Sequence, residues 1–262
     1  MVHDRRRNEY YYNALKKIIT PDSIVLDLGA GLGIHSLMAA KLGAKQVYMV
    51  EPEDVITVAR QIAKDNGIDE GMQFFRGKIE DIDLPSQVDI ILSALSGNFL
   101  LNEDLLPSLF YARDKYLVSN GVLIPDKAIM AATPVYIPDL YGKEIEAWTQ
   151  PVSGLDFNSA RQYSSNTVYY RQEELSKATY LAEAVTLLEM DFSTEQGIHC
   201  DVEQDYTITE SSLCQGWVGW FEIQLLDEWL SSVPHEPKLH WSAAFLPLDP
   251  PINFMEGGTS KI

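Results

Sequence analysis

The hydrophobic positions in the first half of the chain alternate between two spacings. Short apolar runs have the continuous hydrophobicity of strands that are buried on both faces. They cover residues 23–28, 46–50, 72–75, 88–92 and 121–124. Segments with helical spacing lie between them, at residues 34–43, 54–67 and 102–117. Strands that alternate with amphipathic helices predict an α/β fold, with a parallel-type sheet in a Rossmann-like domain over residues 1–125.

The pattern changes after Pro125. Segments with strand-like composition follow one another there, separated by Pro, Gly and Asp. They cover residues 128–137, 184–192, 200–209, 216–226 and 240–248. A helical pattern at residues 171–184 interrupts them. We therefore expect a second, antiparallel and β-barrel-like domain over residues 126–262.

The net charge of −18 is distributed unevenly along the chain. The first 130 residues hold 14 basic and 18 acidic side chains, whereas residues 131–262 hold 6 and 20. So acidic a surface repels phosphate backbones, and it argues against nucleic acid as a partner. It would attract a basic substrate, although the same charge can serve solubility alone.

The chain lacks the signals of a membrane or secreted protein. No apolar run approaches the roughly 18 residues that a membrane-spanning helix needs. The basic N-terminal segment has no apolar block behind it, so it does not resemble a secretory signal. Cys200 and Cys214 have no CxxC spacing. A reduced cytoplasmic protein without membrane partners is the expectation.

A glycine-rich turn follows the first predicted strand. Gly29, Gly31 and Gly33 permit a tight turn and a close approach of a ligand to the backbone. The second predicted strand ends in Glu51, 22 residues after Gly29, where an acid can accept hydrogen bonds from both ribose hydroxyls. The combination predicts a nucleoside site at the carboxyl edge of the sheet. The alternative is that the glycines only form a tight strand–helix turn.

The spacing within this turn distinguishes between nucleoside cofactors. A dinucleotide fingerprint requires G-x-G-x-x-G, and its last position is Ile34 here. Asp27, two residues before the first glycine, could receive an ammonium group, which S-adenosylmethionine has and NAD lacks. We therefore expect S-adenosylmethionine as the cofactor, while Asp27 as a simple turn residue stays an alternative.

Segments along most of the chain resemble the protein arginine methyltransferases, and they occur in the family's order. They are MVHDRRR (1–7), VLDLGAGLGIHS (25–36), FFRGKIEDIDLP (74–85), YARDKYLVSNGVLIPDKA (111–128) and LHW (239–241). The resemblance implies a class I methyltransferase domain followed by a barrel-like domain. It also implies transfer of a methyl group to a nitrogen of a guanidine or another basic acceptor.

The resemblance assigns further residues to the site. Arg7 would hold the carboxylate of the cofactor's methionine part, and the glycine turn with its two acids would hold the ammonium group and the ribose. Ile79 and Glu80 would border the adenine. His240 would lie in the substrate mouth beside Trp241.

One loop departs from the family's pattern, which is Ser-Glu-x-x-Gly with a second Glu nine residues after the first. Ser93, Gly97 and Glu103 match, but Ala94 replaces the first Glu. Two carboxylates in that family clamp the guanidinium, so one of the two is missing here. Ala94 and Ser96 would then shape a less charged substrate pocket.

Two residues are candidates for catalysis. Glu103 could offset the positive charge that forms on the acceptor nitrogen, or it could be an acid favoured at the start of the following helix. His240 could act as a general base or have a structural role. Three hypotheses stay open: an enzyme that methylates a basic protein or peptide, a methyltransferase for a small-molecule acceptor, and a catalytically inactive relative.

The resemblance also predicts an oligomer. The family dimerises through a helical arm inserted in the barrel, and residues 155–185 are expected to form this arm in a homodimer. The chain ends one or two hairpins after Trp241. An open or truncated barrel is therefore expected at the C-terminal end.

Overall fold

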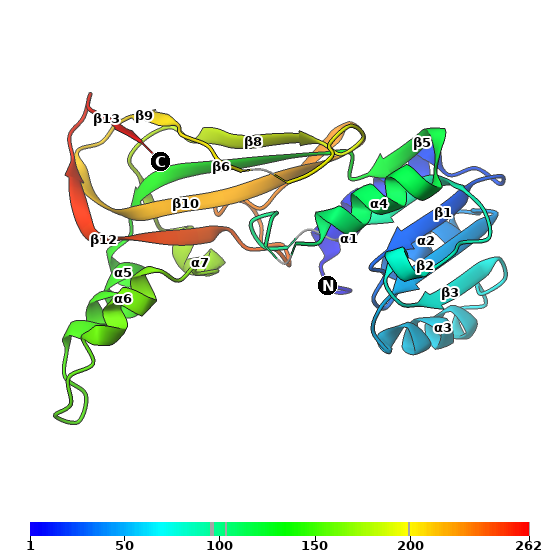
Figure 1. Ribbon diagram of the computed structural model, residues 1–262, viewed down its shortest axis with the longest axis horizontal. Helices are drawn as coiled ribbons and strands as arrows, with labels where there is room; N and C mark the ends of the chain where they lie inside the picture. Colours follow the sequence, from blue (N-terminus) through cyan, green and yellow to red (C-terminus); the bar gives the residue numbers. More distant parts are fainter. Residues whose placement is uncertain (95–96, 103, 199, 262) are drawn as a thin grey trace.

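A computed structural model describes residues 1–94, 97–102, 104–198 and 200–261 of the 262-residue chain. Two sheets lie side by side along the long axis of the molecule, a parallel one and a larger antiparallel one (Figure 1). The predicted fold class is confirmed: a Rossmann-like domain is followed by a curled antiparallel sheet that forms a half-barrel. Within the described residues, no helix is both long and apolar enough to cross a membrane.

The parallel sheet has the strand order β3-β2-β1-β4-β5. Its strands are β1 (Ile24–Leu28), β2 (Gln46–Glu51), β3 (Met72–Arg76), β4 (Val88–Ser93) and β5 (Leu117–Ile124). The order reverses between β1 and β4, so a crevice opens outside their carboxyl ends, where open α/β sheets bind ligands. The central strands are almost entirely buried, which explains their continuous apolar sequence.

Helices cover this sheet. They are α1 (Arg5–Ile18), α2 (Ile34–Lys41), α3 (Val55–Asp65), the short η1 (Ile79–Asp81) and α4 (Leu106–Tyr116). α1 packs on α2, and α4 packs on β4 and β5. The α4 helix begins four residues later than the periodicity of 102–117 predicts, because Pro107 takes a position in its first turn, where a missing N–H costs nothing.

The antiparallel sheet is built on two long strands, β6 (Lys127–Tyr136) and β10 (Ser212–Leu225), which pair over most of their length. Further strands flank them: β7 (Thr179–Tyr180), β8 (Val185–Asp191), β11 (Glu228–Ser231) and β12 (Ala244–Phe254). A separate pair is formed by β9 (Asp205–Thr207) and β13 (Thr259–Lys261). Of the strand predicted at 200–209, only the three residues of β9 form a strand.

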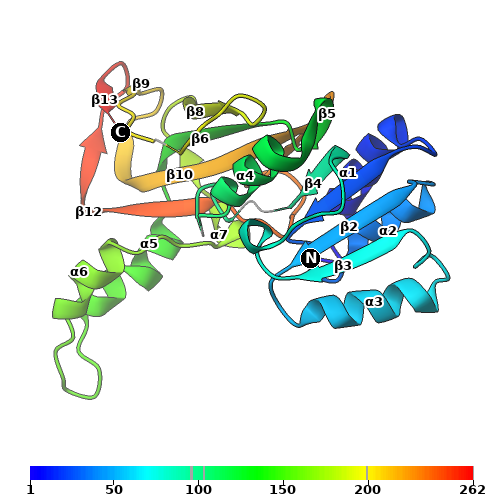
Figure 2. The same ribbon diagram turned by 45° about the vertical axis from the view of Figure 1, so that its right-hand side comes forward.

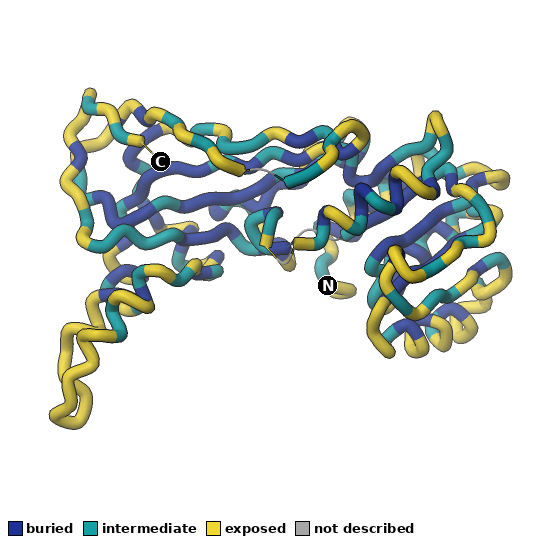
Figure 3. The backbone as a smooth tube through the Cα atoms, in the orientation of Figure 1, coloured by how far each residue is buried: buried dark blue, intermediate teal, exposed yellow. Residues whose placement is uncertain are grey.

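A helical segment projects from the half-barrel (Figures 1 and 2). It contains α5 (Pro138–Glu144), η2 (Glu146–Thr149) and α6 (Ser159–Ser165). We call residues 138–168 the arm. The predicted bounds of 155–185 are wrong at both ends, because the projection already begins at α5 and residues 172–185 form α7 (Gln172–Leu175), β7 and the start of β8. The outer part of the arm is almost entirely exposed, whereas β6 and β10 are buried over much of their length (Figure 3).

The helix predicted at 171–184 is wrong. The structure has only α7 (Gln172–Leu175) there, and the chain then enters β7. The Leu181 N–H donates to the carbonyl of Pro134 at 2.9 Å, and the Leu181 side chain is fully buried. Pairing with β6 and burial in the half-barrel therefore override the local helical pattern.

Candidate functional site

One cavity of about 570 Å³ lies outside the carboxyl ends of β1, β2 and β4. Most of the predicted site residues line it: Arg7, Asp27, Gly29, Gly31, Glu51, Ala94, His240 and Trp241. They come from α1, from the three central strand ends and from the segment before β12. The fold thus brings together residues that are up to 234 positions apart in the sequence, Arg7 and Trp241.

The glycine turn leads from β1 into α2 with a left-handed backbone. Gly29, Gly31 and Gly33 have φ of 70°, 55° and 79°. A Cβ on Gly31 would meet nothing within 4 Å, so this glycine faces open space in the cavity and leaves room for a ligand. Gly33 does not line the cavity: it precedes α2, and a Cβ there would lie 2.4 Å from the Met49 side chain.

Two carboxylates fix the turn from either side. Glu51, at the end of β2, accepts hydrogen bonds from the backbone N–H groups of Gly31 at 2.8 Å and Glu53 at 3.0 Å. Asp27 accepts from the backbone N–H of Ser36 at 3.0 Å and from its hydroxyl at 2.5 Å. Burial raises the pKa of Asp27 to about 6, against the lowering effect of the two Ser36 hydrogen bonds.

Arg7 supplies a buried cation with unpaired hydrogen-bond donors. Its side chain is fully buried, and the guanidinium donates from Nη2 to the carbonyl of Met1 at 3.0 Å. Nε and Nη1 are buried without a hydrogen-bond partner. The guanidinium also lies 5.5 Å from the centre of the Trp241 ring. A buried guanidinium with unpaired donors is costly unless an anion completes its contacts, so the cavity fits a ligand carboxylate.

Asp4 links α1 to the segment before β12. Its Oδ1 accepts from the backbone N–H of Arg7 at 3.0 Å and so caps α1. Its Oδ2 accepts from the backbone N–H of His240 at 2.6 Å. The exposed His240 is thereby fixed at the mouth, while the buried Trp241 packs edge-to-face on Phe221.

The predicted adenine-side residues lie apart from this cavity. Ile79 is buried in the core of the parallel-sheet domain and lines neither cavity described here. Glu80 lines an adjoining cavity of about 540 Å³, which shares Gly29 and Leu105 with the first. The Glu80 carboxylate accepts a hydrogen bond from the Ser108 hydroxyl at 2.6 Å.

The loop after β4 is only partly described. Ser96 and Glu103 lie outside the described residues, and Ala94 lines the cavity. A Cβ on Gly97 would lie 1.8 Å from the backbone oxygen of Asn102, so no other residue fits this turn. Phe99, with φ of 53°, places its ring against Gly219 of β10. Phe99 thus connects the segment after β4 to the half-barrel.

Sequence reasoning missed His35. It is buried in the first turn of α2, lines the cavity and stacks on Tyr11 with ring centres 4.1 Å apart. Burial, and secondarily the charge of Arg7, lowers the pKa of His35 to about 3. Its sequence position carries no signal, because a single His within a helix is more often a packed core residue.

Comparison with protein families divides the chain into two matches. Residues 11–125 match the family "Ribosomal protein L11 methyltransferase (PrmA)", and residues 126–260 match the "Arginine methyltransferase oligomerization subdomain".

Individual relatives and solved structures cover nearly all of the chain. Protein arginine N-methyltransferase 1.1 of Arabidopsis thaliana is 32% identical over 99% of this chain and 68% of its own length. Protein arginine N-methyltransferase 1 of Chlamydomonas reinhardtii is 33% identical over 85% of this chain and 65% of its own. A chain of the Trypanosoma brucei PRMT1 enzyme–prozyme heterotetrameric complex with AdoHcy superposes with a TM-score of 0.90, at 28% identity, over 100% of this chain and 84% of that one. Protein arginine methyltransferase 10 of Arabidopsis thaliana gives a TM-score of 0.85, at 27% identity, over 99% of this chain and 84% of that one.

Proposed function

We propose that this chain, which belongs to the protein arginine methyltransferase family, transfers a methyl group to a guanidinium nitrogen of a basic protein. The family gives the reaction class, methyl transfer, and the cofactor, S-adenosylmethionine. The acceptor, the position of the cofactor and the roles of individual residues are our proposals.

The proposal rests on a single cavity that can hold both reactants. At its inner end, Arg7 offers unpaired buried donors for a carboxylate, and Asp27 and Glu51 offer carboxylates for an ammonium group and for ribose hydroxyls. At its mouth stand Ala94 and His240, with space for an acceptor. When bound, the cofactor supplies the activated methyl group.

The adjoining cavity extends the proposed cofactor site. Glu80 and Ser108 line it, and it shares Gly29 with the first cavity. We place the adenine there, with Ile79 as the buried support beneath it. A nucleoside would then span the carboxyl edges of β1 and β2, with its sugar beside Glu51.

The protein's part in the transfer is orientation and charge. The acceptor nitrogen gains positive charge as it attacks the methyl group, and a carboxylate nearby stabilises that charge. Glu103 is the proposed carboxylate. The acceptor nitrogen also loses a proton, which passes to a base or to water. The acidic half of the chain, with 6 basic and 20 acidic residues over 131–262, attracts a basic acceptor to the mouth.

A radiolabel assay tests the proposal. The full chain is incubated with methyl-labelled S-adenosylmethionine and an arginine-rich peptide, with the same peptide carrying Lys for Arg as the control. We expect label on the arginine peptide only, and at least about a tenfold gain with Ala94→Glu, which restores a second carboxylate at the mouth. Equal labelling of both peptides would contradict a guanidinium acceptor.

Ala94 favours a second candidate function. With one carboxylate missing from the loop, the chain could bind the cofactor without transferring the methyl group and act as a partner for an active chain. The heterotetrameric complex of Trypanosoma brucei is described as an enzyme–prozyme assembly. Binding of S-adenosylhomocysteine without labelling of any peptide by wild type or Ala94→Glu would favour this candidate.

We also propose that the arm pairs two copies of the chain. It carries exposed apolar side chains, among them Val152, Leu155 and Tyr163 at 58%, 61% and 82% exposure. Large exposed apolar side chains clustered on one projection are typical of an interaction surface. The matched oligomerisation subdomain includes the whole arm.

A further inference from the structure

His35 is a polar group whose purpose the fold alone does not explain. Its side chain is 4% exposed, and Nε2 is buried without any hydrogen-bond partner. A buried polar atom left without a partner has lost its hydrogen bonds to water and gained none in return, which destabilises the protein. A ligand in the cavity that His35 lines would supply the missing partner.

The imidazole is held rigidly. It stacks on the Tyr11 ring with centres 4.1 Å apart and planes inclined by 10°. The Tyr11 hydroxyl donates to the backbone carbonyl of Ser93 at 2.8 Å, which fixes that ring between α1 and the end of β4. His35 is therefore preorganised on helix α2, at the wall of the cavity and not on a loop.

The surroundings indicate the charge of the missing partner. Arg7 acts electrostatically on His35, and its own Nε and Nη1 are buried without partners. Burial and this guanidinium lower the pKa of His35 to about 3, so the ring is neutral and carries a single N–H. Arg7 and His35 both line the cavity, and a carboxylate there has lone pairs for the Arg7 donors and for an N–H on Nε2 of His35.

We propose that His35 is a positioning residue that donates a hydrogen bond from Nε2 to the carboxylate of the cofactor's amino-acid part, beside Arg7. This inference rests on the proposed placement of the cofactor in the cavity. It assigns the tautomer with the proton on Nε2. It also explains a polar residue in the first turn of a helix that otherwise packs against the sheet.

Two substitutions separate hydrogen bonding from packing. His35→Phe retains an aromatic ring that can stack on Tyr11 but removes the donor. His35→Gln removes the ring but offers an amide N–H at about the same distance along the side chain. Both variants are first compared with wild type by thermal unfolding.

Calorimetry with three ligands then tests the inference: S-adenosylhomocysteine, its decarboxylated analogue, and 5′-methylthioadenosine, which lacks the amino-acid part. We expect His35→Phe to bind S-adenosylhomocysteine about tenfold more weakly, and His35→Gln to recover part of that loss. Binding of the two ligands without a carboxylate should change less than about twofold in either variant.

The outcomes distinguish this inference from the proposed site itself. Equal weakening of all three ligands by His35→Phe would mean that His35 only supports the fold, and unchanged binding of S-adenosylhomocysteine would overturn its role as a donor. Wild-type protein that binds none of the ligands would instead overturn the proposed cofactor site.

Discussion

Asp27 combines two tasks that both favour its ionised form, whereas its burial opposes that charge. It anchors the start of α2 through Ser36, whose N–H and hydroxyl both donate to one carboxylate oxygen. It also lines the cavity in which we place the cofactor's ammonium group. Burial and the nearby Glu51 raise its pKa to about 6, whereas Ser36 and Arg7 lower it. The free protein therefore gains a proton at Asp27 when the pH falls below about 6.

This titration predicts a pH dependence of cofactor binding. An ammonium group binds the ionised carboxylate, so binding favours the deprotonated form and weakens as the pH falls through the pKa of Asp27. From pH 8 to pH 5, the affinity for S-adenosylhomocysteine should fall about tenfold. The pKa of His35, about 3, lies below this range, so His35 does not contribute. Calorimetry at several pH values provides the measurement.

The control for this prediction is Asp27→Asn, which retains an acceptor for Ser36 and removes the charge. It should bind S-adenosylhomocysteine at pH 8 about tenfold more weakly than wild type and show little change down to pH 5. A variant with the same pH profile as wild type would place the titrating group elsewhere.

At the scale of single residues, the sequence predicted those parts of the site that follow from strand ends. Glu51 and Asp27 could be found because parallel strands deliver their last residues to one edge of the sheet. His35 could not, because its environment depends on Tyr11 of another helix and on the Arg7 charge. Those contacts are tertiary, and no spacing in the sequence encodes them.

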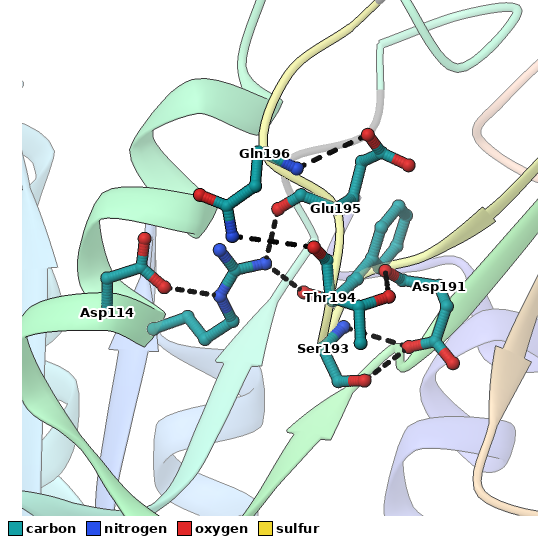
Figure 4. Close-up of polar contacts among 8 residues, drawn as sticks. Asp114, Asp191, Ser193, Thr194, Glu195 and Gln196 are labelled. Carbon is teal, nitrogen blue, oxygen red and sulfur yellow. Dashed lines mark hydrogen bonds and ion pairs between the residues drawn. The ribbon is translucent and has the colours of Figure 1, made fainter.

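At the scale of elements, one arginine joins the two sheets. Arg113 of α4 is buried and donates from Nη1 to the carbonyls of Phe192 at 2.6 Å and Glu195 at 2.7 Å, just after β8. Its Nε donates to Asp114 at 2.7 Å. Figure 4 shows Asp114 and Glu195 on either side of this contact.

The Phe192 and Glu195 carbonyls that accept these hydrogen bonds lie in a turn that the Asp191 side chain stabilises. Its carboxylate accepts from the backbone N–H of Ser193 at 3.0 Å and from its hydroxyl at 2.5 Å (Figure 4). The backbone carbonyl of Asp191 accepts from the N–H of Glu195 at 3.0 Å. In this Asx-type turn, the carbonyls of Phe192 and Glu195 point towards α4 and accept hydrogen bonds from Arg113.

Arg113→Met should destabilise the protein by about 2–3 kcal/mol, because it leaves two carbonyls without their charged donor. The free energy of unfolding from urea titration measures this loss. The control is Arg60→Met, since Arg60 also lies within a helix but is exposed, and it should change stability by less than about 0.5 kcal/mol. Equal effects of the two substitutions would contradict a special role for this contact.

Helices and strands could be predicted from the sequence where the local hydrophobic pattern and the tertiary pairing favour the same conformation. Each of the five strands of the parallel sheet contains a short apolar run, and β6 and β10 are long enough to be found in the second half. The helix expected at 171–184 was wrong, because Leu181 is buried and pairs with Pro134 of β6. In that segment, the half-barrel decides the backbone conformation and local propensity does not.

At the scale of the whole molecule, the arm carries exposed apolar side chains next to a turn with a defined backbone conformation. Val152 and Leu155 exchange two backbone hydrogen bonds of 3.0 Å across a tight turn at its tip. Ser153 and Gly154 have φ of 53° and 77°, both positive as a type I′ turn requires. A fixed turn loses little conformational entropy on binding, so exposed apolar residues on it are suited to association.

If the arm pairs two copies, charges placed on it should separate them. The double variant Leu155→Asp and Tyr163→Asp puts carboxylates where apolar side chains are 61% and 82% exposed, so each monomer should fold as before while the interface carries desolvated charge. Sedimentation velocity should show wild type as a dimer and the variant as a monomer at the same concentration. Met255→Asp, at an apolar side chain 69% exposed outside the arm, is the matched control and should stay dimeric. A dimeric double variant would mean that another surface joins the subunits, and a monomeric wild type would mean that the arm serves a different partner.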